Sequence, residues 1–177
     1  MDHKDHVALL KNGIEGSNGV WADFGAGDGA FTLALADLLE SPGEIHVLDK
    51  SAHALQGNQT AMRQRFPHMP AQFQVADFTQ PLQLPPLDGI IMANSLHFVR
   101  DKQPVLQQIM SLLKPGGRFI LVEYESDRGN TWVPFPLSYG TWQPMATAAG
   151  FVNTRRLLLR PSRFLEGIYS ALSFKPT

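Results

Sequence analysis

The sequence contains no cysteine, and this absence excludes several kinds of site at once. Without thiols the chain can form no disulfide, bind no zinc ion through thiolates and use no cysteine nucleophile. No metal site is predicted. Net charge is also nearly absent, at −1, because 15 basic residues face 16 acidic ones. A general electrostatic attraction to nucleic acid or to an anionic membrane is therefore not expected.

Long apolar runs are missing as well. The apolar stretches are far too short to span a bilayer, and residues 1–13 are charged and lack the apolar core of a signal peptide. We therefore expect a soluble, cytoplasmic protein with no membrane partner. A length of 177 residues with 44% hydrophobic residues suits a single domain over 1–177, in which residues 1–17 form a short N-terminal extension. His3 and His6 would belong to a mobile terminus.

Apolar runs alternate with amphipathic stretches along the whole chain. Strands are predicted at residues 20–24, 44–48, 72–76, 89–93 and 118–124. Helices are predicted from residue 31 to a stop at 41–43, from a Ser51 cap to about residue 65, and over 101–113. The proline-rich stretch 80–86 predicts a loop and residues 114–117 a turn. A short helix at 143–149 precedes two strands, 152–159 and 164–174, which the segment 160–162 joins as an antiparallel hairpin.

This order predicts an α/β fold with a doubly wound, mostly parallel sheet of seven strands and a C-terminal antiparallel hairpin. In sheets of this kind, ligands bind at the carboxyl ends of the strands, near the point where the strand order reverses. The loops after Phe24, Leu48, Ala76, Ala93 and Val122 should therefore meet at one site.

A glycine-rich turn follows the first strand, in the segment Asp23-Phe24-Gly25-Ala26-Gly27-Asp28-Gly29. Such a turn lets the backbone approach a ligand closely, and it also fits the loose dinucleotide pattern. Charge separates the two interpretations. Asp23 and Asp28 would place carboxylates near a dinucleotide's diphosphate, whereas the ammonium and sulfonium groups of S-adenosylmethionine favour nearby negative charge. The turn therefore favours the sulfonium cofactor over a nicotinamide dinucleotide.

Two further acids follow the second and third strands. Asp49 lies twenty residues after Gly29 and could accept hydrogen bonds from both ribose hydroxyls of an adenosine, or could simply precede the helix that begins at Ser51. Asp77 could accept from an adenine amino group while Phe78 packs on the ring, or could form an ordinary turn.

Five segments together resemble the successive motifs of class I S-adenosylmethionine methyltransferases, and most closely the small-molecule group that includes quinone-biosynthesis enzymes. These segments are VWADFGAGDG (20–29), Asp49, ADF (76–78), DGIIMANSLHF (88–98) and LKPGGRFILVE (113–123). The resemblance covers about residues 18–175. It implies the Rossmann-like methyltransferase fold, S-adenosylmethionine as methyl donor and S-adenosylhomocysteine as product. The predicted cofactor-binding residues are Asp23, Gly25, Ala26, Gly27, Gly29, Asp49, Lys50, Asp77, Phe78 and Asn94.

The resemblance also implies which part of the cofactor each residue contacts. The glycines would contact the methionine portion, with Asp23 near its ammonium and the main chain of Asn94 on the same side. Asp49 would bind the ribose and Asp77 the adenine amine. Many relatives carry a longer N-terminal helix or an insertion that covers the pocket. Because only about eighteen residues precede the first strand here, the site is either open or closed by a partner chain, such as the second copy in a homodimer.

The methyl acceptor is expected to be a small molecule methylated at an O, N or C atom. His97 is a candidate general base, or else a structural imidazole, and Glu123 is a second candidate catalytic residue at a strand end. Four aromatic residues in the segment 130–142 wall an acceptor pocket or anchor the loop. The arginines at 155, 156, 160 and 163 would bind an acidic acceptor or RNA, or would cover a solvated strand face. Two alternatives stay open: a non-catalytic module that binds S-adenosylmethionine or S-adenosylhomocysteine and acts through a partner, and an NAD(P)-dependent oxidoreductase.

Overall fold

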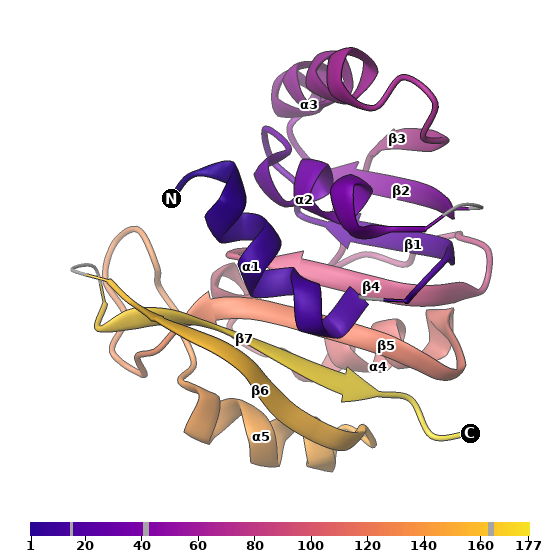
Figure 1. The fold of residues 1–177 in the computed structure, drawn as a ribbon. Helices are drawn as coiled ribbons and strands as arrows, with labels where there is room; N and C mark the ends of the chain where they lie inside the picture. Colours follow the sequence, from indigo (N-terminus) through magenta and orange to yellow (C-terminus); the bar gives the residue numbers. More distant parts are fainter. Residues whose placement is uncertain (15, 41–42, 163–164) are drawn as a thin grey trace.

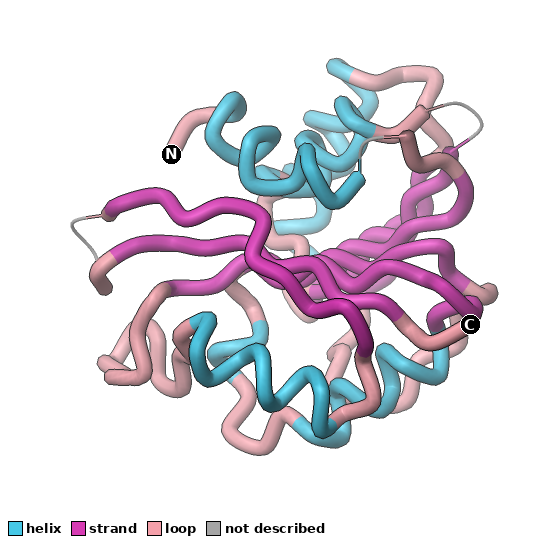
Figure 2. Tube along the Cα trace, turned by 60° about the horizontal axis from the view of Figure 1, so that its bottom comes forward, coloured by secondary structure: helices cyan, strands magenta, loops and turns pink. Residues whose placement is uncertain are grey.

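A twisted sheet forms the centre of the molecule, with helices on both faces (Figures 1 and 2). The computed structural model describes residues 1–14, 16–40, 43–162 and 165–177. In these ranges the strands are β1 (Gly19–Phe24), β2 (Gly43–Asp49), β3 (Ala71–Val75), β4 (Leu87–Ala93), β5 (Leu113–Tyr124), β6 (Val152–Pro161) and β7 (Gly167–Phe174). The helices are α1 (His3–Ile14), α2 (Ala30–Leu38), α3 (Ala52–Arg65), the short 3-10 helix η1 (Leu96–Phe98), α4 (Gln103–Leu112) and α5 (Tyr139–Ala148).

Within the described residues the strands form one seven-stranded sheet in the order β3-β2-β1-β4-β5-β7-β6. Strands β1 to β5 pair in parallel, and β7 runs antiparallel to both β5 and β6. The predicted fold class is therefore confirmed. The chain moves outward from β1 to β3 and then returns to place β4 on the other side of β1, so the strand order reverses between β1 and β4. This is where a ligand site is expected in an open α/β sheet.

Each face of the sheet has its own apolar core, because the buried strands are hydrophobic on both sides. One core lies beneath α1, α2 and α3 and includes Trp21, Ile91 and Val122. The other lies beneath α4 and α5 and includes Phe24, Met92 and Trp142. Alternate residues of β1 and β4 thus serve opposite layers, as the two-residue repeat of a strand requires.

The N-terminal residues correct one prediction. His3 and His6 do not belong to a mobile terminus, because they lie in α1, which packs on α2 and on the strands β5 to β7. Leu9, Leu10 and Ile14 have no exposed surface, so this helix contributes to the core. The sequence signal was weak because α1 combines three charged residues with a mean hydropathy near zero, and only its inner face is apolar.

Several element boundaries also differ from the prediction. The expected turn at residues 114–117 is the start of β5, which begins at Leu113 and pairs with β4 across a register shift. Helix α5 begins at Tyr139, four residues before the predicted helix, because Ser138 caps it by accepting from the N–H of Thr141. Arg160 and Pro161 belong to β6 rather than to the hairpin connection. The predicted helix stop at 41–42 and the predicted strand start at 164 lie outside the described residues.

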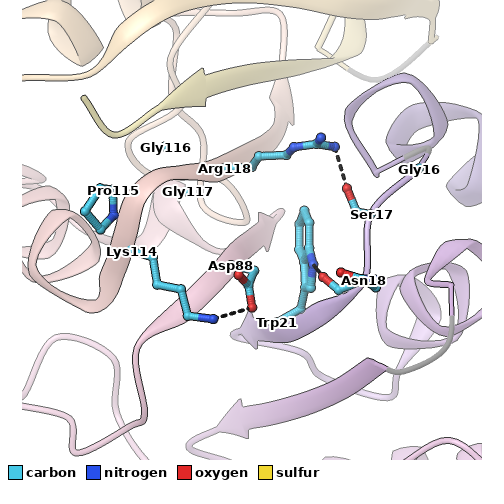
Figure 3. Close-up of a pocket in the computed structure, with 10 residues that line it drawn as sticks. All are labelled: Gly16, Ser17, Asn18, Trp21, Asp88, Lys114, Pro115, Gly116, Gly117 and Arg118. Carbon is cyan, nitrogen blue, oxygen red and sulfur yellow. Dashed lines mark hydrogen bonds and ion pairs between the residues drawn. The ribbon is translucent and has the colours of Figure 1, made fainter. Parts of the chain in front are cut away.

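A small polar pocket of about 250 Å³ lies at the amino edge of the sheet, where Arg118 and Ser17 face each other above Trp21 (Figure 3). Its charged groups have partners within the chain. Asp88 accepts from Lys114 and from the N–H of Val20, and Arg118 donates to the carbonyl of Gly13 as well as to Ser17. The bonds of Arg118 tie the end of α1 to β5, and those of Asp88 tie β4 to β1 and to the start of β5, so these charged groups stabilise the fold. No described helix has the length and apolarity needed to cross a membrane.

Candidate functional site

A cleft of about 460 Å³ opens at the carboxyl edge of the sheet, at the point where the strand order reverses. Its walls come from the loops that follow β1, β2, β3 and β4, which are four of the five loops predicted to meet there, whereas the loop after β5 does not line this cleft. The lining residues are Gly25, Gly27, Asp49, Lys50, Ala76, Asp77, Phe78, Thr79, Asn94, Ser95, Phe98 and Val99.

The glycine turn forms the floor of this cleft and is fixed from both sides. The N–H groups of Gly25 and Ala26 donate to the carbonyl of Leu48 on β2, at 2.8 and 3.0 Å. From the other side, the hydroxyl of Ser95 after β4 donates to the carbonyl of Phe24 at 2.9 Å. The turn is therefore held between its two neighbouring strands before any ligand binds.

Asp49 links the turn to the second strand. Its Oδ2 accepts from the N–H of Gly27 and its Oδ1 from the N–H of Ser51, both at 2.8 Å. This acid organises the start of α3, as one interpretation predicted, and it also lines the cleft. Each carboxylate oxygen can accept more than one hydrogen bond, so Asp49 keeps capacity for a pair of ligand hydroxyls.

Asp77 forms the turn that the alternative interpretation predicted, and it lies at the cleft as well. Its Oδ1 accepts from the N–H of Thr79 at 2.9 Å and from the Thr79 hydroxyl at 2.7 Å. These hydrogen bonds lower the pKa of Asp77, so its carboxylate stays ionised. Phe78 and Thr79 continue the same wall, which places an aromatic face beside a fixed acceptor.

The side-chain oxygen of Asn94 lies at the cleft without a hydrogen-bond partner among the described residues. The residue follows β4 with a positive φ of 52°, an uncommon conformation for a residue other than glycine. Its Oδ1 is buried, and no described residue donates a hydrogen bond to it. A buried acceptor of this kind costs free energy unless a donor reaches it. A ligand ammonium or N–H group would fulfil that requirement.

Asp23 does not line the cleft, although it was predicted to bind the ammonium. It is 1% exposed beneath the glycine turn and accepts from the hydroxyl of Thr32 at 2.7 Å. Asn58 of α3 donates to the same hydroxyl at 2.9 Å, which completes a buried chain through β1, α2 and α3. Asp28 is exposed and lies beside α3. The negative charge of the cleft thus comes from Asp49 and Asp77. It does not come from Asp23 and Asp28, which were predicted to provide it.

The Asp23 carboxyl should make the stability of the fold depend on pH. Burial raises its pKa from 3.8 to about 7, and the nearby charge of Asp49 acts in the same direction. The unfolded chain releases this proton near pH 4, whereas the folded chain retains it until about pH 7. Stability is therefore fully present below pH 4 and falls as the pH rises towards about 7.

Urea unfolding at several pH values tests this expectation. In the wild type, the urea concentration at the unfolding midpoint should fall as the pH rises from 4 to 7. In Asp23→Asn this fall should be absent, because the amide does not titrate. Asp77→Asn is the matched control. Because the pKa of Asp77 is lowered in the fold, its ionisation adds to the free energy of unfolding as the pH rises, which is opposite to the effect of Asp23. A pH profile that Asp23→Asn leaves unchanged would show that Asp23 is ionised in the fold near pH 5.

His97 and Glu123, the two candidate catalytic residues, form a buried pair below the cleft. The Nδ1 atom of His97 lies 2.8 Å from Oε2 of Glu123, and the His97 N–H donates to Oε1 at 3.0 Å. Their side chains are 2% and 0% exposed. A carboxylate at Nδ1 favours the tautomer with its proton on that nitrogen, which leaves Nε2 free to accept one. The His97 ring also contacts Phe98 of the cleft, with ring centroids 4.3 Å apart.

The aromatic segment 130–142 anchors its loop rather than lining the cleft. Trp142 is fully buried in the core, and Phe135 lies under the guanidinium of Arg100 while its N–H donates to the carbonyl of His97. Trp132 is the exception, with 77% of its surface exposed. Lys102 reinforces the anchoring, because its Nζ donates to the carbonyls of Val99 and Phe135.

The described arginines near the final hairpin also contact different partners. Arg155 lies over the ring of Phe174 and Arg156 over that of Tyr139. Arg160 pairs with Asp5 of α1 at 2.5 Å. Arg163 lies outside the described residues. The described arginines therefore do not form one continuous basic surface.

The structure brings together most of the predicted cofactor residues. The residues that line the cleft are Gly25, Gly27, Asp49, Lys50, Asp77, Phe78 and Asn94, whereas Asp23, Ala26 and Gly29 do not line it. Sequence reasoning missed Ala76, Thr79, Ser95, Phe98 and Val99. Ala76, Ser95 and Phe98 lie within segments that the resemblance had already identified, and Thr79 and Val99 directly follow those segments.

Comparison with known proteins identifies the family to which the chain belongs. A family model described as a methyltransferase domain matches residues 22–119, which is more than half of the chain. The demethylmenaquinone methyltransferase of Lactiplantibacillus plantarum is 33% identical over 116 residues, covering 60% of this chain and 46% of that enzyme. The chain thus spans about half the length of this relative.

Solved structures show the same fold at lower identity. The 1,6-didemethyltoxoflavin N1-methyltransferase of Burkholderia thailandensis, solved with its substrate and S-adenosylhomocysteine, has a TM-score of 0.77 at 20% identity, covering 99% of this chain and 79% of its own. A phosphoethanolamine N-methyltransferase of Haemonchus contortus, also with S-adenosylhomocysteine, has a TM-score of 0.80 at 15% identity, covering 98% and 53%. With its sheet order, its glycine turn and the family match over residues 22–119, the chain belongs to the family of class I methyltransferase domains.

Proposed function

We propose that the chain binds S-adenosylmethionine in the carboxyl-edge cleft and transfers its methyl group to an O, N or C atom of a small-molecule acceptor. The observation that carries the proposal is the cleft itself, in which a fixed glycine turn faces two carboxylates on the next two strands. Such a site attracts a cationic ligand and disfavours the diphosphate of a nicotinamide cofactor.

The residues of the cleft fit this cofactor group by group. The two oxygens of Asp49 would accept from the ribose hydroxyls, and Asp77 would accept from the adenine amine beside the ring of Phe78. The unpartnered Oδ1 of Asn94 would accept from the methionine ammonium. Two structural neighbours with this fold contain the demethylated product S-adenosylhomocysteine, which supports the choice of cofactor.

The protein's part in the reaction would be positioning and proton transfer. When bound, the cofactor supplies a methyl group on a positively charged sulfur, which is already an activated electrophile. The cleft would hold this group in line with the acceptor, and such alignment supplies much of the acceleration. Where the acceptor atom carries a proton, His97 would remove it through Nε2, and Glu123 would hold the ring in the required tautomer.

Calorimetry tests the cofactor assignment directly. S-adenosylmethionine and S-adenosylhomocysteine should bind to the chain, and NADH should not. Tight binding of NADH without a response to the sulfur compounds would favour an oxidoreductase and overturn the proposal. Transfer of a labelled methyl group to metabolite pools then tests catalysis. Persistent failure of a folded, cofactor-saturated protein would favour a non-catalytic binding module that acts through a partner.

Asp49→Ala should weaken the binding of S-adenosylhomocysteine by about 1–3 kcal/mol, because the ribose loses its acceptor and the N–H of Gly27 loses its partner. Asp49→Asn should have a smaller effect, because its amide oxygen can still accept from one of these groups. Titration calorimetry measures both. An unchanged affinity in Asp49→Ala would remove this residue from the binding site.

A further inference from the structure

A second cavity lies at the same edge of the sheet and belongs to no part of the cofactor cleft. It has a volume of about 360 Å³ and lies between the start of α1, the end of β5 and the β6–β7 hairpin. Its lining residues are Met1, Asp5, Tyr124, Arg160, Pro161, Ser162 and Ile168. Tyr124 and Glu123 are consecutive residues of β5, so they face opposite sides of the sheet. Glu123 meets His97, and Tyr124 enters this cavity on the α1 side.

The cavity adjoins the methionine end of the cofactor cleft. Strands β4 and β5 are neighbours, and the N–H of Asn94 in the cleft donates to the carbonyl of Val122, two residues before Tyr124. The rings of Tyr124 and His97 have centroids 5.9 Å apart, and His97 in turn contacts Phe98 of the cleft. The ring of Tyr124 therefore connects the second cavity with the proposed base, one strand away from the residues proposed to hold the methyl donor.

The walls of the cavity combine an apolar surface with the ion pair of Arg160 and Asp5. Met1, Pro161, Ile168 and the ring of Tyr124 supply the apolar part of this surface. Arg160 is the described arginine of the hairpin that reaches a cavity, since Arg155 and Arg156 lie over aromatic rings elsewhere. One of its nitrogens contacts Asp5, but a guanidinium has five N–H donors in a planar fork. Donors therefore remain for the two oxygens of a bound carboxylate.

We propose that this second cavity holds the methyl acceptor, and that the acceptor is a small planar molecule carrying a carboxylate that binds to Arg160. The inference rests on the proposed methyl-transfer function, which it deepens by naming the class of substrate. Asp5 limits the affinity, because it competes with the acceptor for the guanidinium. Burial and the charge of Glu123 raise the pKa of Tyr124, so its hydroxyl remains protonated beside the bound anion.

Three probes of equal size and different charge test the proposal: benzoate, benzyl alcohol and benzylamine. They are titrated into the full chain, saturated with S-adenosylhomocysteine, and followed by protein NMR. Benzoate should bind at least tenfold more tightly than the other two and should shift the signals of Tyr124 and Ile168. Equal or tighter binding of benzylamine, or benzoate shifts confined to other regions, would overturn the proposal without the need for any variant.

Substitutions then locate the anion. Arg160→Gln should weaken benzoate binding at least tenfold, Arg160→Lys should weaken it less, and Asp5→Asn should strengthen it by removing the competing carboxylate. Arg156→Gln is the matched control, because it removes a cation from the same strand outside the cavity. Equal benzoate affinity in Arg156→Gln and Arg160→Gln would also overturn the proposal. Circular dichroism checks that each variant is folded. If Arg160→Gln does not fold, the benzoate affinity of Arg160→Lys decides the test.

The same samples separate this inference from the function on which it rests. If S-adenosylhomocysteine binds and benzoate does not, the acceptor proposal fails and the cofactor proposal stands. If S-adenosylhomocysteine does not bind, the cofactor proposal fails. A charge-selective benzoate response in the unsaturated protein would then still establish the second cavity as a carboxylate site.

Discussion

Gly25→Ala is expected to weaken the binding of S-adenosylhomocysteine by roughly 100-fold or more and to destabilise the fold by about 2–4 kcal/mol. Gly25 has a φ of +76°, which disfavours any residue with a Cβ atom. An added Cβ would also lie 2.6 Å from Cβ of Ser95 and 3.2 Å from a ring carbon of Phe78. Relief of these contacts must move the turn, Ser95 or Phe78, all of which belong to the cleft.

Gly27→Ala provides the control for this substitution. Gly27 also has a positive φ, of 52°, but no atom lies within 4 Å of the position that its Cβ would take. It should therefore incur only the backbone strain, about 1–2 kcal/mol, without displacing a neighbour. Thermal unfolding and titration calorimetry on both variants measure the difference. Equal losses of affinity would show that strain in the turn, rather than contact with Ser95 and Phe78, controls the cleft.

Glu123→Gln should reduce methyl transfer to a proton-bearing acceptor by about 10²–10⁴-fold, the usual contribution of a general base. The amide would present an N–H group to Nδ1 of His97 and so move the ring proton to Nε2, where it blocks proton uptake. His97→Asn should cause a similar loss. Binding of S-adenosylhomocysteine should stay within about twofold, because neither side chain lines the cofactor cleft.

Two measurements separate this catalytic role from a structural one. The ¹⁵N chemical shifts of the His97 ring report which nitrogen carries the proton, and they should exchange between wild type and Glu123→Gln. Glu125→Gln is a suitable control, because it changes a neighbouring acid whose Oε1 accepts from the N–H of Tyr139 instead. Full activity in Glu123→Gln, with the tautomer exchanged, would show that His97 is not the base.

The seven strands and their mostly parallel pairing were accessible from sequence because their signals are local. Apolar runs such as residues 89–93 mark buried strands, and glycine or proline breaks separate them. The alternation then leaves few topologies. The start of β5 was missed because Pro115, Gly116 and Gly117 normally indicate a turn, whereas here they lie in a strand with a register shift. Helix α1 was missed because its identity depends on the surface against which Leu9 and Leu10 pack.

The residues of the candidate site were predictable where the backbone geometry requires a particular residue type. They were less predictable where packing determines the direction in which a side chain points. The glycines of the turn, Asp49 and Asp77 could be found from their positions after strands. The depth of Asp23 could not, because a sequence does not show whether an acid at a strand end points into the cleft or beneath it. The pairing of His97 with Glu123 depends on contact between residues 26 positions apart.

The loop between β5 and α5 carries a consequence for spectroscopy. Of the three tryptophans, Trp21 and Trp142 are at most 1% exposed, whereas Trp132 projects from this loop into solvent. A water-soluble collisional quencher such as iodide should therefore reach Trp132 and leave the emission of the other two nearly intact. The red-shifted part of the fluorescence spectrum would then report on one loop of the molecule without any chemical label.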